Sequence, residues 1–232
     1  MISIICSNYN SSNYIQNYCK YVNSQTLHTF EVVFVDASST DDSLQQFKDF
    51  SFRDGIEVTI IPVASRVTVY EAWNIGIKNS KYDYVMNYNT DDKLFGNALL
   101  TFRSYITLYP HIDVLYSNCF VSDDPNHNNL VSFHNWQDAS DMKVLMQGCC
   151  CGPFPLLKKQ TVIEHGLFNP DFWISGDYEM WCRMNSKGAK FKKLDEALGV
   201  YYKNPMGVST MPNVDRHVEH VRQDTLIRST YA

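Results

Sequence analysis

Short apolar runs alternate with helix-forming segments over roughly the first 90 residues, and this alternation limits the fold more than any other feature of the chain. The clearest run is Phe30–Asp36, which is almost continuously apolar up to its final acid. Such a run is typical of a strand buried on both faces of a parallel sheet. Three further strands are predicted at Ile2–Cys6, Val58–Pro62 and Tyr84–Tyr88. Parallel strands joined by helices need right-handed crossovers, so the pattern predicts an α/β domain with a mostly parallel, Rossmann-like sheet.

Helices and shorter strands account for the rest of the predicted fold. In the first part, helices are expected after the polar turn Ser7–Asn13, after the capping segment Ser38–Ser43, and over Tyr70–Asn79. The second part is less regular. It is expected to contain helices at Phe95–Tyr109, Lys158–His165, Gly176–Lys187 and Val214–Ser229, strands at Asp113–Ser117, Leu130–Phe133, Lys190–Leu194 and Leu198–Tyr202, and a loop at Met206–Pro212.

Length and charge favour one folded domain without a polyanionic partner. A chain of 232 residues is long enough for one substantial core and short for two. The net charge of -5 gives no general attraction to nucleic acid or to an anionic membrane. No stretch approaches the roughly 18 apolar residues of a membrane span, so no transmembrane segment is expected.

The cysteines and the first residues indicate a cytoplasmic protein. The seven cysteines are an odd number at scattered positions, which argues against a disulfide framework and fits a reducing compartment. The run Cys149–Cys151 lacks the paired spacing of a zinc site and is interpreted as small apolar packing. No basic leader precedes the first strand, so no signal peptide is expected. Peripheral attachment to a membrane stays open.

Two adjacent carboxylates follow the fourth predicted strand, in the sequence Asn89-Thr90-Asp91-Asp92. A parallel strand that ends in acids places them at the carboxyl edge of the sheet, where open α/β sheets bind ligands. Carboxylates suit hard divalent cations, which in turn suit phosphates, so one hypothesis is a metal-diphosphate site. The alternative is that Asp92 caps a helix formed by the apolar run that begins at Leu94.

The glycine motifs that hold nucleotides in other α/β proteins are missing. After the first strand the chain reads Ser7-Asn8-Tyr9-Asn10, without Gly-x-Gly-x-x-Gly, so a dinucleotide-binding site loses its main support. No phosphate-cradling Gly-x4-Gly-Lys-Ser/Thr loop occurs either. Any nucleotide must therefore be held by other means.

The order of several sequence blocks resembles the family 2 glycosyltransferases of the GT-A fold, over about residues 2–210. The blocks are Ile2–Asn10, Phe30–Asp41, Val69–Ile77, Asn89–Asp92, Gly166–Phe172 and Ser175–Arg183. This resemblance implies a single GT-A domain with a mostly parallel central sheet and a small antiparallel portion. Residues 1–92 would be the nucleotide-sugar-binding half, residues 93–210 the acceptor-side half, and residues 211–232 a C-terminal helix or tail.

The resemblance also assigns roles in binding a UDP-sugar. Tyr9 matches the residue whose ring covers the uracil, with a half-buried core aromatic as its alternative role. Asp36 matches the acid that hydrogen-bonds the nucleoside, and helix capping is its alternative. Arg66 would meet a phosphate or remain solvated. Asn74 occupies a recurring polar position or is a packed helix amide. Ser7, in the turn of the first block, belongs to the same predicted site.

The acidic block implies a divalent cation, Mn²⁺ or Mg²⁺, on the diphosphate. Asp91 matches the last Asp of the family's Asp-x-Asp motif, and Asp92 is either a second ligand or the helix cap described above. Asn89 stands where the family usually has the first Asp and would face the ribose or metal-bound waters, with Thr90 beside it. The family often has a late His near the metal, but the corresponding segment Tyr201–Ser209 has none, which leaves the third protein ligand open.

The late blocks imply the catalytic base. Asp177 aligns with the carboxylate that takes the proton of the acceptor hydroxyl in an inverting reaction, while capping of the following helix is its alternative. Glu179 is expected to be structural, and Trp173 and Trp181 are either a sugar platform or core residues. Together these features imply a glycosyltransferase that moves a sugar from a UDP-sugar to the hydroxyl of a glycan or another acceptor.

Two other functions stay open at this point. One is a non-catalytic nucleotide- or glycan-binding module of the same fold. The other is a sugar-phosphate nucleotidyltransferase, an enzyme that begins with a glycine-rich, Arg- and Lys-bearing loop where this chain has Ser7–Asn10.

Overall fold

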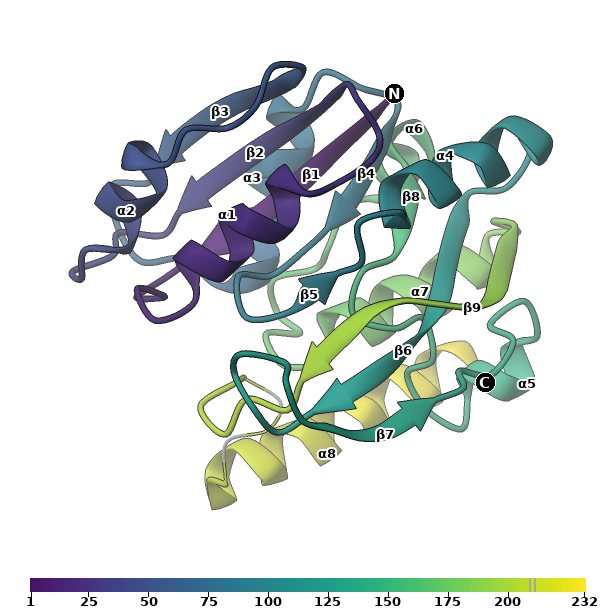
Figure 1. Cartoon of the computed structure of the whole chain (residues 1–232). Coiled ribbons are helices and arrows are strands. Elements are labelled where there is room, and N and C mark those ends of the chain that lie inside the picture. The colour runs from purple at the N-terminus through teal and green to yellow at the C-terminus, as the bar shows by residue number, and fades with distance from the viewer. Residues whose placement is uncertain (209, 211) are drawn as a thin grey trace.

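One continuous mixed sheet runs through the chain in the computed structural model, which describes residues 1–208, 210 and 212–232 (Figure 1). The strand order is β3-β2-β1-β4-β8-β6-β9-β5, and β7 lies beside β6. The strands are β1 (Ile2–Asn8), β2 (Phe30–Asp36), β3 (Ile56–Pro62), β4 (Tyr84–Asn87), β5 (Lys93–Leu94), β6 (Val114–Ser122), β7 (Leu130–His134), β8 (Leu156–Lys158) and β9 (Phe191–Tyr202).

The first four strands form the predicted parallel sheet. β1 lies between β2 and β4, and β3 is the outer strand beyond β2, all in parallel. In this register Asn8 lies opposite Asp36, and Ile5 lies opposite Asn87. The carboxyl ends of β1, β2 and β4 therefore meet at one edge, which brings together the polar turn after β1, the acid at the end of β2 and the acidic pair after β4.

The rest of the sheet is mixed, as expected for the second half. β8 pairs antiparallel with both β4 and β6, while β6 and β9 run parallel. β7 and β5 add short antiparallel pairs to β6 and β9. The predicted fold class, a mostly parallel α/β sheet with a small antiparallel portion, is confirmed.

Helices cover both faces of this sheet, with α1 and α4 in front of it and α3 and α7 behind it in the view of Figure 1. The helices are α1 (Ile15–Asn23), α2 (Ser43–Asp49), α3 (Val69–Asn79), α4 (Ala98–Leu108), α5 (Met142–Leu145), α6 (Lys159–His165), α7 (Gly176–Ser186) and α8 (Val214–Tyr231). Alternate strand residues face the two layers: Ile4 packs in the core with α1 and α4, and Ile5 in the core with α3 and α7.

Several predicted boundaries were wrong. The strands expected at Lys190–Leu194 and Leu198–Tyr202 are one strand, β9, whose pairing with β6 shifts register after Ser117. The helix expected from Phe95 begins at Ala98, because Lys93–Leu94 pairs with β9 as β5. Consequently Asp92 does not cap that helix, whose N-cap residue is Asn97. The expected loop Met206–Pro212 includes residues 209 and 211, which lie outside the described residues.

Each of the seven cysteines, all of them within the described residues, is free, so the absence of a disulfide framework is confirmed. Cys150 and Cys151 are buried as predicted for apolar packing, whereas Cys149 is exposed. Within the described part of the chain, no helix has the length and apolar character needed to span a bilayer.

Candidate active site

The turns after β1 and β2 interlock at the carboxyl edge. Asp36 is 2% exposed, and its Oδ1 accepts from the Asn8 side-chain amide at 2.6 Å and from the Ser39 hydroxyl at 2.6 Å. Its Oδ2 accepts from the Ser39 backbone N–H at 3.2 Å. Asn10 adopts a positive φ of 50° and accepts from the Thr40 N–H at 2.8 Å. Asp36 therefore fixes the shape of the edge, in addition to the nucleoside contact predicted for it.

Tyr9 lies on this edge with its ring partly open to solvent. The side chain is 37% exposed, and the Arg66 guanidinium carbon lies 4.4 Å from the ring centroid. This distance is that of a cation–π contact. The structure thus brings together two residues that were assigned separately to the base and to a phosphate, while Ser7 lies just before them at the end of β1.

Asp91 is held by residues from two distant loops. Its Oδ2 accepts from the Asn204 side-chain amide at 2.8 Å, and its backbone carbonyl oxygen lies 3.0 Å from Nε2 of His127. Because a carbonyl oxygen only accepts, Nε2 of His127 carries the proton, and Nδ1 faces the Tyr21 hydroxyl at 3.4 Å. Burial raises the pKa of Asp91, which the Asn204 hydrogen bond partly offsets, and burial lowers the pKa of His127.

Asp92 lies deeper, at 1% exposure, and ties the acidic segment to the end of β9. Its Oδ1 accepts from the Tyr202 backbone N–H at 3.0 Å. The Tyr88 hydroxyl supports the same turn by donating to the Asp92 carbonyl at 3.1 Å and accepting from the Leu94 N–H at 3.1 Å. Burial, and then the charge of Asp91, raise the pKa of Asp92 well above its usual range. Asn89 is half-buried and Thr90 buried beside these acids.

Asp177 stands in the first turn of α7. Its Oδ1 accepts from the Tyr70 hydroxyl at 3.1 Å and from the Tyr178 backbone N–H at 2.9 Å. The thiol of Cys149 donates to Oδ2 at 3.8 Å. Burial raises the pKa of Asp177, and these hydrogen bonds, led by the Tyr178 N–H, lower it in part. Since α3 follows the carboxyl end of β3 after the short segment 63–68, Tyr70 in its first turn holds Asp177 at the same edge as Asp91.

The C-terminal helix fixes the segment that leads into α7. Oε1 of the buried Gln223 accepts from the backbone N–H groups of Ile174 and Ser175 at 3.2 and 3.0 Å. The Ser175 hydroxyl donates to Asp224 at 2.7 Å. Sequence reasoning gave α8 no part in the site, and no local pattern identifies a contact across about 50 residues.

The remaining predicted residues lie as follows. The side chain of Asn74 donates to the Phe168 carbonyl at 2.7 Å and accepts from the Phe168 N–H at 2.9 Å, so its amide joins α3 to the loop before α7. Glu179 forms an ion pair with Arg183 at 2.8 Å, as expected for a structural acid. Trp181 is 1% exposed and belongs to the core, whereas Trp173 is half-buried with Arg216 over its ring at 5.8 Å.

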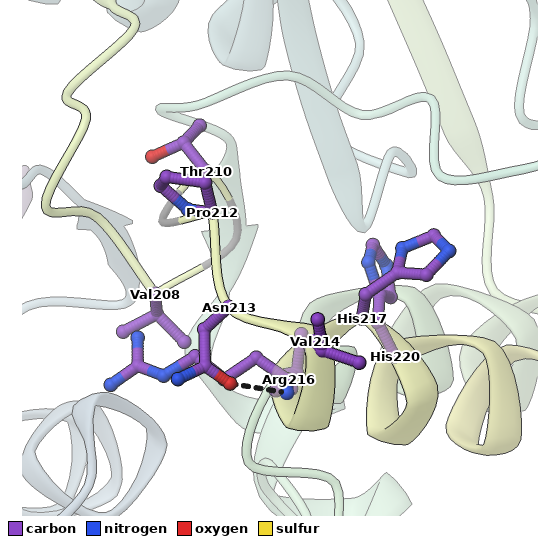
Figure 2. Close-up of a pocket in the computed structure, with 9 residues that line it drawn as sticks. Val208, Thr210, Pro212, Asn213, Val214, Arg216, His217 and His220 are labelled. Carbon is purple, nitrogen blue, oxygen red and sulfur yellow. Dashed lines mark hydrogen bonds between the residues drawn. The ribbon is translucent and has the colours of Figure 1, made fainter.

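A cavity of about 530 Å³ lies between the loop after β9 and the start of α8. Figure 2 shows Val208, Thr210 and Pro212 on the loop side, with the Arg216 side chain extending toward Val208 and the imidazoles of His217 and His220 on the other side. Ile174, whose carbonyl also accepts from Tyr70, lines the same cavity. The cavity therefore adjoins both the loop that reaches Asp91 and the segment that carries Asp177.

The donor set at the acidic pair suits a cation that arrives with a diphosphate. Among the described residues, no group of three or more His, Cys, Asp and Glu side chains is arranged to hold a metal ion. Mg²⁺-type cations, however, are usually bound by one or two carboxylates together with substrate phosphates and water. Asp91 on the carboxyl edge fits that pattern, and Asn204 lies in the loop where the family often has a late His.

The sheet order 3-2-1-4 with a mixed second half, and acids gathered at its carboxyl edge, define a GT-A-type nucleotide-sugar transferase fold. The sequence model described as Glycosyl transferase family 2 matches residues 3–166. The chain therefore belongs to glycosyl transferase family 2, and Asp177 lies beyond the matched residues.

Relatives and solved structures agree with this placement. The chain is 25% identical to the glycosyltransferase GlyG of Streptococcus pneumoniae over 128 residues, which cover 55% of this chain and 42% of GlyG. It matches S. aureus TarS 1-349 in complex with UDP-GlcNAc with a TM-score of 0.76 at 18% identity, covering 99% of this chain and 71% of that one.

The complex of TarS 1-349 with UDP matches with a TM-score of 0.73 at 18% identity, covering 97% and 64% of the two chains. The mannosyltransferase PcManGT of Pyrobaculum calidifontis, in complex with GDP-Man and Mn²⁺, matches with 0.74 at 15% identity, covering 100% and 64%. These likenesses show the fold. The chain spans less than two thirds of the length of GlyG and of TarS 1-349 with UDP.

Proposed function

We propose that this chain transfers a sugar from a UDP-sugar to a hydroxyl acceptor, with inversion at the anomeric carbon. The observation that carries the proposal is that the Asp91 and Asp177 carboxylates share one sheet edge, each held by hydrogen bonds to its own set of residues. Such a transfer needs one carboxylate that holds a cation on the leaving diphosphate and one that accepts the proton of the incoming hydroxyl.

Tyr9 and Arg66 are assigned to the donor. The partly exposed Tyr9 ring offers a face on which uracil stacks, and Arg66 beside it supplies a charge for the diphosphate. The TarS structures with UDP and UDP-GlcNAc support a uridine donor, although the mannosyltransferase PcManGT, which is in complex with GDP-Man, has the same fold. Ser7, Asp36, Asn89 and Thr90 complete the proposed donor site, and Asn74 supports it through the loop at Phe168.

A divalent cation, Mn²⁺ or Mg²⁺, is assigned to Asp91 and the donor diphosphate. When bound, it would neutralise charge on the departing diphosphate. Asn204 and the backbone contact with His127 orient Asp91 toward that position. Asp92 is proposed to act mainly by fixing the end of β9, because its Oδ1 already accepts from Tyr202. The Mn²⁺ in the PcManGT complex supports the assignment.

Asp177 is assigned as the general base. As the acceptor oxygen attacks the anomeric carbon, the proton of its hydroxyl passes to the carboxylate and the bond to the diphosphate breaks on the opposite face of the sugar. A pKa raised by burial makes this carboxylate a stronger base than an exposed Asp. The cavity beside Ile174 is the proposed entrance for the acceptor, a glycan or another hydroxyl compound.

Two measurements test the proposal together. Isothermal titration with UDP is expected to show binding that Mn²⁺ strengthens and that Asp91→Ala weakens. UDP release from UDP-GlcNAc is expected in the wild type and in the control Asp171→Asn, an exposed acid in the loop before α7, and to be lost in Asp177→Asn with UDP binding retained. Full activity of Asp177→Asn would remove this residue from the mechanism.

The alternatives give different results in the same assays. A non-catalytic binding module, favoured by the neutral amides of Asn89 and Asn204 around Asp91, would bind UDP without any hydrolysis or transfer. A nucleotidyltransferase would release pyrophosphate from a nucleoside triphosphate. We also propose a cytoplasmic setting, which the seven free cysteines support. The boundary between the nucleotide-sugar-binding half and the acceptor-side half is proposed to lie at about residue 92.

A further inference from the structure

Tyr70 connects the first turn of α3 to the turn that carries Asp177. The residue lies within a complete capping box formed by Thr68 and Glu71 and is 4% exposed. Its hydroxyl lies 2.8 Å from the Ile174 carbonyl oxygen and 3.1 Å from Oδ1 of Asp177. The ring is stacked on Phe168 at 5.7 Å between centroids. A side chain fixed at both ends in this way has one orientation available.

Gly176 shows how closely the ring approaches the base. A Cβ atom at this position would lie 2.8 Å from two carbon atoms of the Tyr70 ring. Real Cβ atoms do not approach that closely, so the glycine directly before Asp177 is required by the ring and not by a turn. The Tyr70 ring and the backbone of the first turn of α7 are thus in direct contact, independently of the hydroxyl hydrogen bond.

The surroundings of Asp177 give Tyr70 a large share in setting its charge. The other groups facing the carboxylate are the backbone N–H groups of Asp177 itself and of Tyr178, and the Cys149 thiol, with Cys151 farther along the same loop. Within the described residues, no basic side chain forms an ion pair with Asp177. Burial and the charge of Asp177 raise the pKa of Tyr70 well above its usual range, so its hydroxyl keeps the proton that it donates.

We propose that Tyr70 is a positioning residue for the catalytic base: its hydroxyl holds Oδ1 of Asp177 and turns Oδ2 toward the acceptor. The acceptor proton then passes to Oδ2, the oxygen beside Cys149. This inference rests on the proposed role of Asp177 as the base. It predicts that the hydroxyl of Tyr70, and not only its ring, affects the proton transfer.

The test is the variant Tyr70→Phe, which keeps the ring and its packing and removes the hydroxyl. A hydrogen bond to a carboxylate stabilises its charged form, so its loss raises the pKa of Asp177 and moves the acid limb of the pH–rate profile to higher pH. We expect a shift of about one pH unit, the low end for a hydrogen bond to a charged group, because the hydroxyl is shared with the Ile174 carbonyl. Hydrolysis of UDP-GlcNAc supplies the rate, and the KM for UDP-GlcNAc is expected to stay unchanged.

Tyr116→Phe is the matched control. Tyr116 is buried like Tyr70, and its hydroxyl donates to the Gln137 carbonyl at 2.7 Å and accepts from the Ala139 N–H at 2.7 Å, without contact to Asp177. A loss of stability at least as large, without a pH shift, is expected there, because the buried Ala139 N–H loses its acceptor. An acid limb in Tyr70→Phe that coincides with those of the wild type and the control would overturn the inference.

Carboxyl-carbon NMR of Asp177 in the full chain with UDP separates this inference from the proposed function. A higher pKa in Tyr70→Phe than in Tyr116→Phe supports the positioning role even if Asp177→Asn proves fully active and the base assignment fails. Identical titration of Asp177 in the wild type and both variants refutes the positioning role, whatever the activity.

Discussion

Two substitutions of Asp92 distinguish a structural role of this carboxylate from a role as a metal ligand. The carboxylate is 1% exposed and accepts from the Tyr202 backbone N–H, which joins the acidic segment to β9 across 110 residues. In Asp92→Asn the amide oxygen still accepts that hydrogen bond, and the buried charge is gone. In Asp92→Ala the N–H is left buried without an acceptor. The two variants therefore change the charge and the hydrogen bond separately.

The loss of this hydrogen bond determines how far Asp92→Ala is expected to lower the free energy of unfolding. An unsatisfied buried donor costs about 1–3 kcal/mol in free energy of unfolding. For a domain of this size, 1 kcal/mol corresponds to roughly 2–4 °C in Tm, so the melting temperature is expected to fall by roughly 2–12 °C. Asp92→Asn is expected to be at least as stable as the wild type at pH 7, because it removes the cost of burying a charge.

The pH dependence follows from the raised pKa of Asp92. An unfolded Asp titrates near about 3.9, so below that pH both states are protonated and Asp92 and Asn behave alike. As the pH rises toward the higher folded pKa, the wild type loses stability that Asp92→Asn retains. The difference between the two unfolding free energies, measured in urea, should therefore grow from about pH 4 upward.

Titration of each Asp92 variant with UDP, in the presence and absence of Mn²⁺, completes the experiment. If Asp92 is structural, Asp92→Asn keeps the Mn²⁺-dependent affinity for UDP that Asp91→Asn loses. A variant Asp92→Asn that is less stable than the wild type at pH 7 refutes the reasoning on the buried charge, and one that binds UDP as weakly as Asp91→Asn shows that Asp92 is a ligand.

Two further predictions concern the donor edge and the packing beneath it. Tyr9→Ala is expected to weaken UDP binding up to about tenfold, the upper value for an aromatic pair. The control Tyr109→Ala removes an equally exposed ring, which has Lys192 over it at 4.5 Å, and should leave UDP binding unchanged. Equal affinities of the two variants for UDP in titration calorimetry would exclude stacking on Tyr9. Gly76→Ala would place a Cβ 2.3 Å from Cγ2 of Ile5. The variant is expected to lower the free energy of unfolding in urea by about 1–3 kcal/mol, although Ala has the better helix propensity. An unchanged urea midpoint would show that α3 can move away from β1.

Local sequence patterns predicted the parallel half of the fold well. Phe30–Asp36 is β2 at both ends, because a continuous apolar run bounded by polar residues leaves little choice of boundary. β5 and β8, of two and three residues, are too short for any periodicity to identify. β9 was divided in two because the exposed residues Asp195 and Glu196 interrupt its apolar pattern where the pairing with β6 shifts.

The site was predictable only where topology alone decides position. Acids at the ends of parallel strands must share an edge, which is why Asp36 and Asp91 were identified from their places in the chain. The contact of Tyr70 with Asp177 spans 107 residues and that of Asn204 with Asp91 spans 113. Such pairs leave no local signal, since each partner alone is an ordinary polar residue in a turn or helix.

The hydrogen bonds from Ile174 and Ser175 to Gln223 have a consequence for the order in which the protein matures. During synthesis a chain folds from its N-terminus onward at a rate set by the ribosome. The donor edge is complete in sequence once Asn204 has emerged, whereas the segment before Asp177 acquires its clamp only when α8 is made. A nascent chain is therefore expected to bind a nucleotide before the segment that leads to its base is fixed, which delays full turnover until Gln223 has left the ribosome.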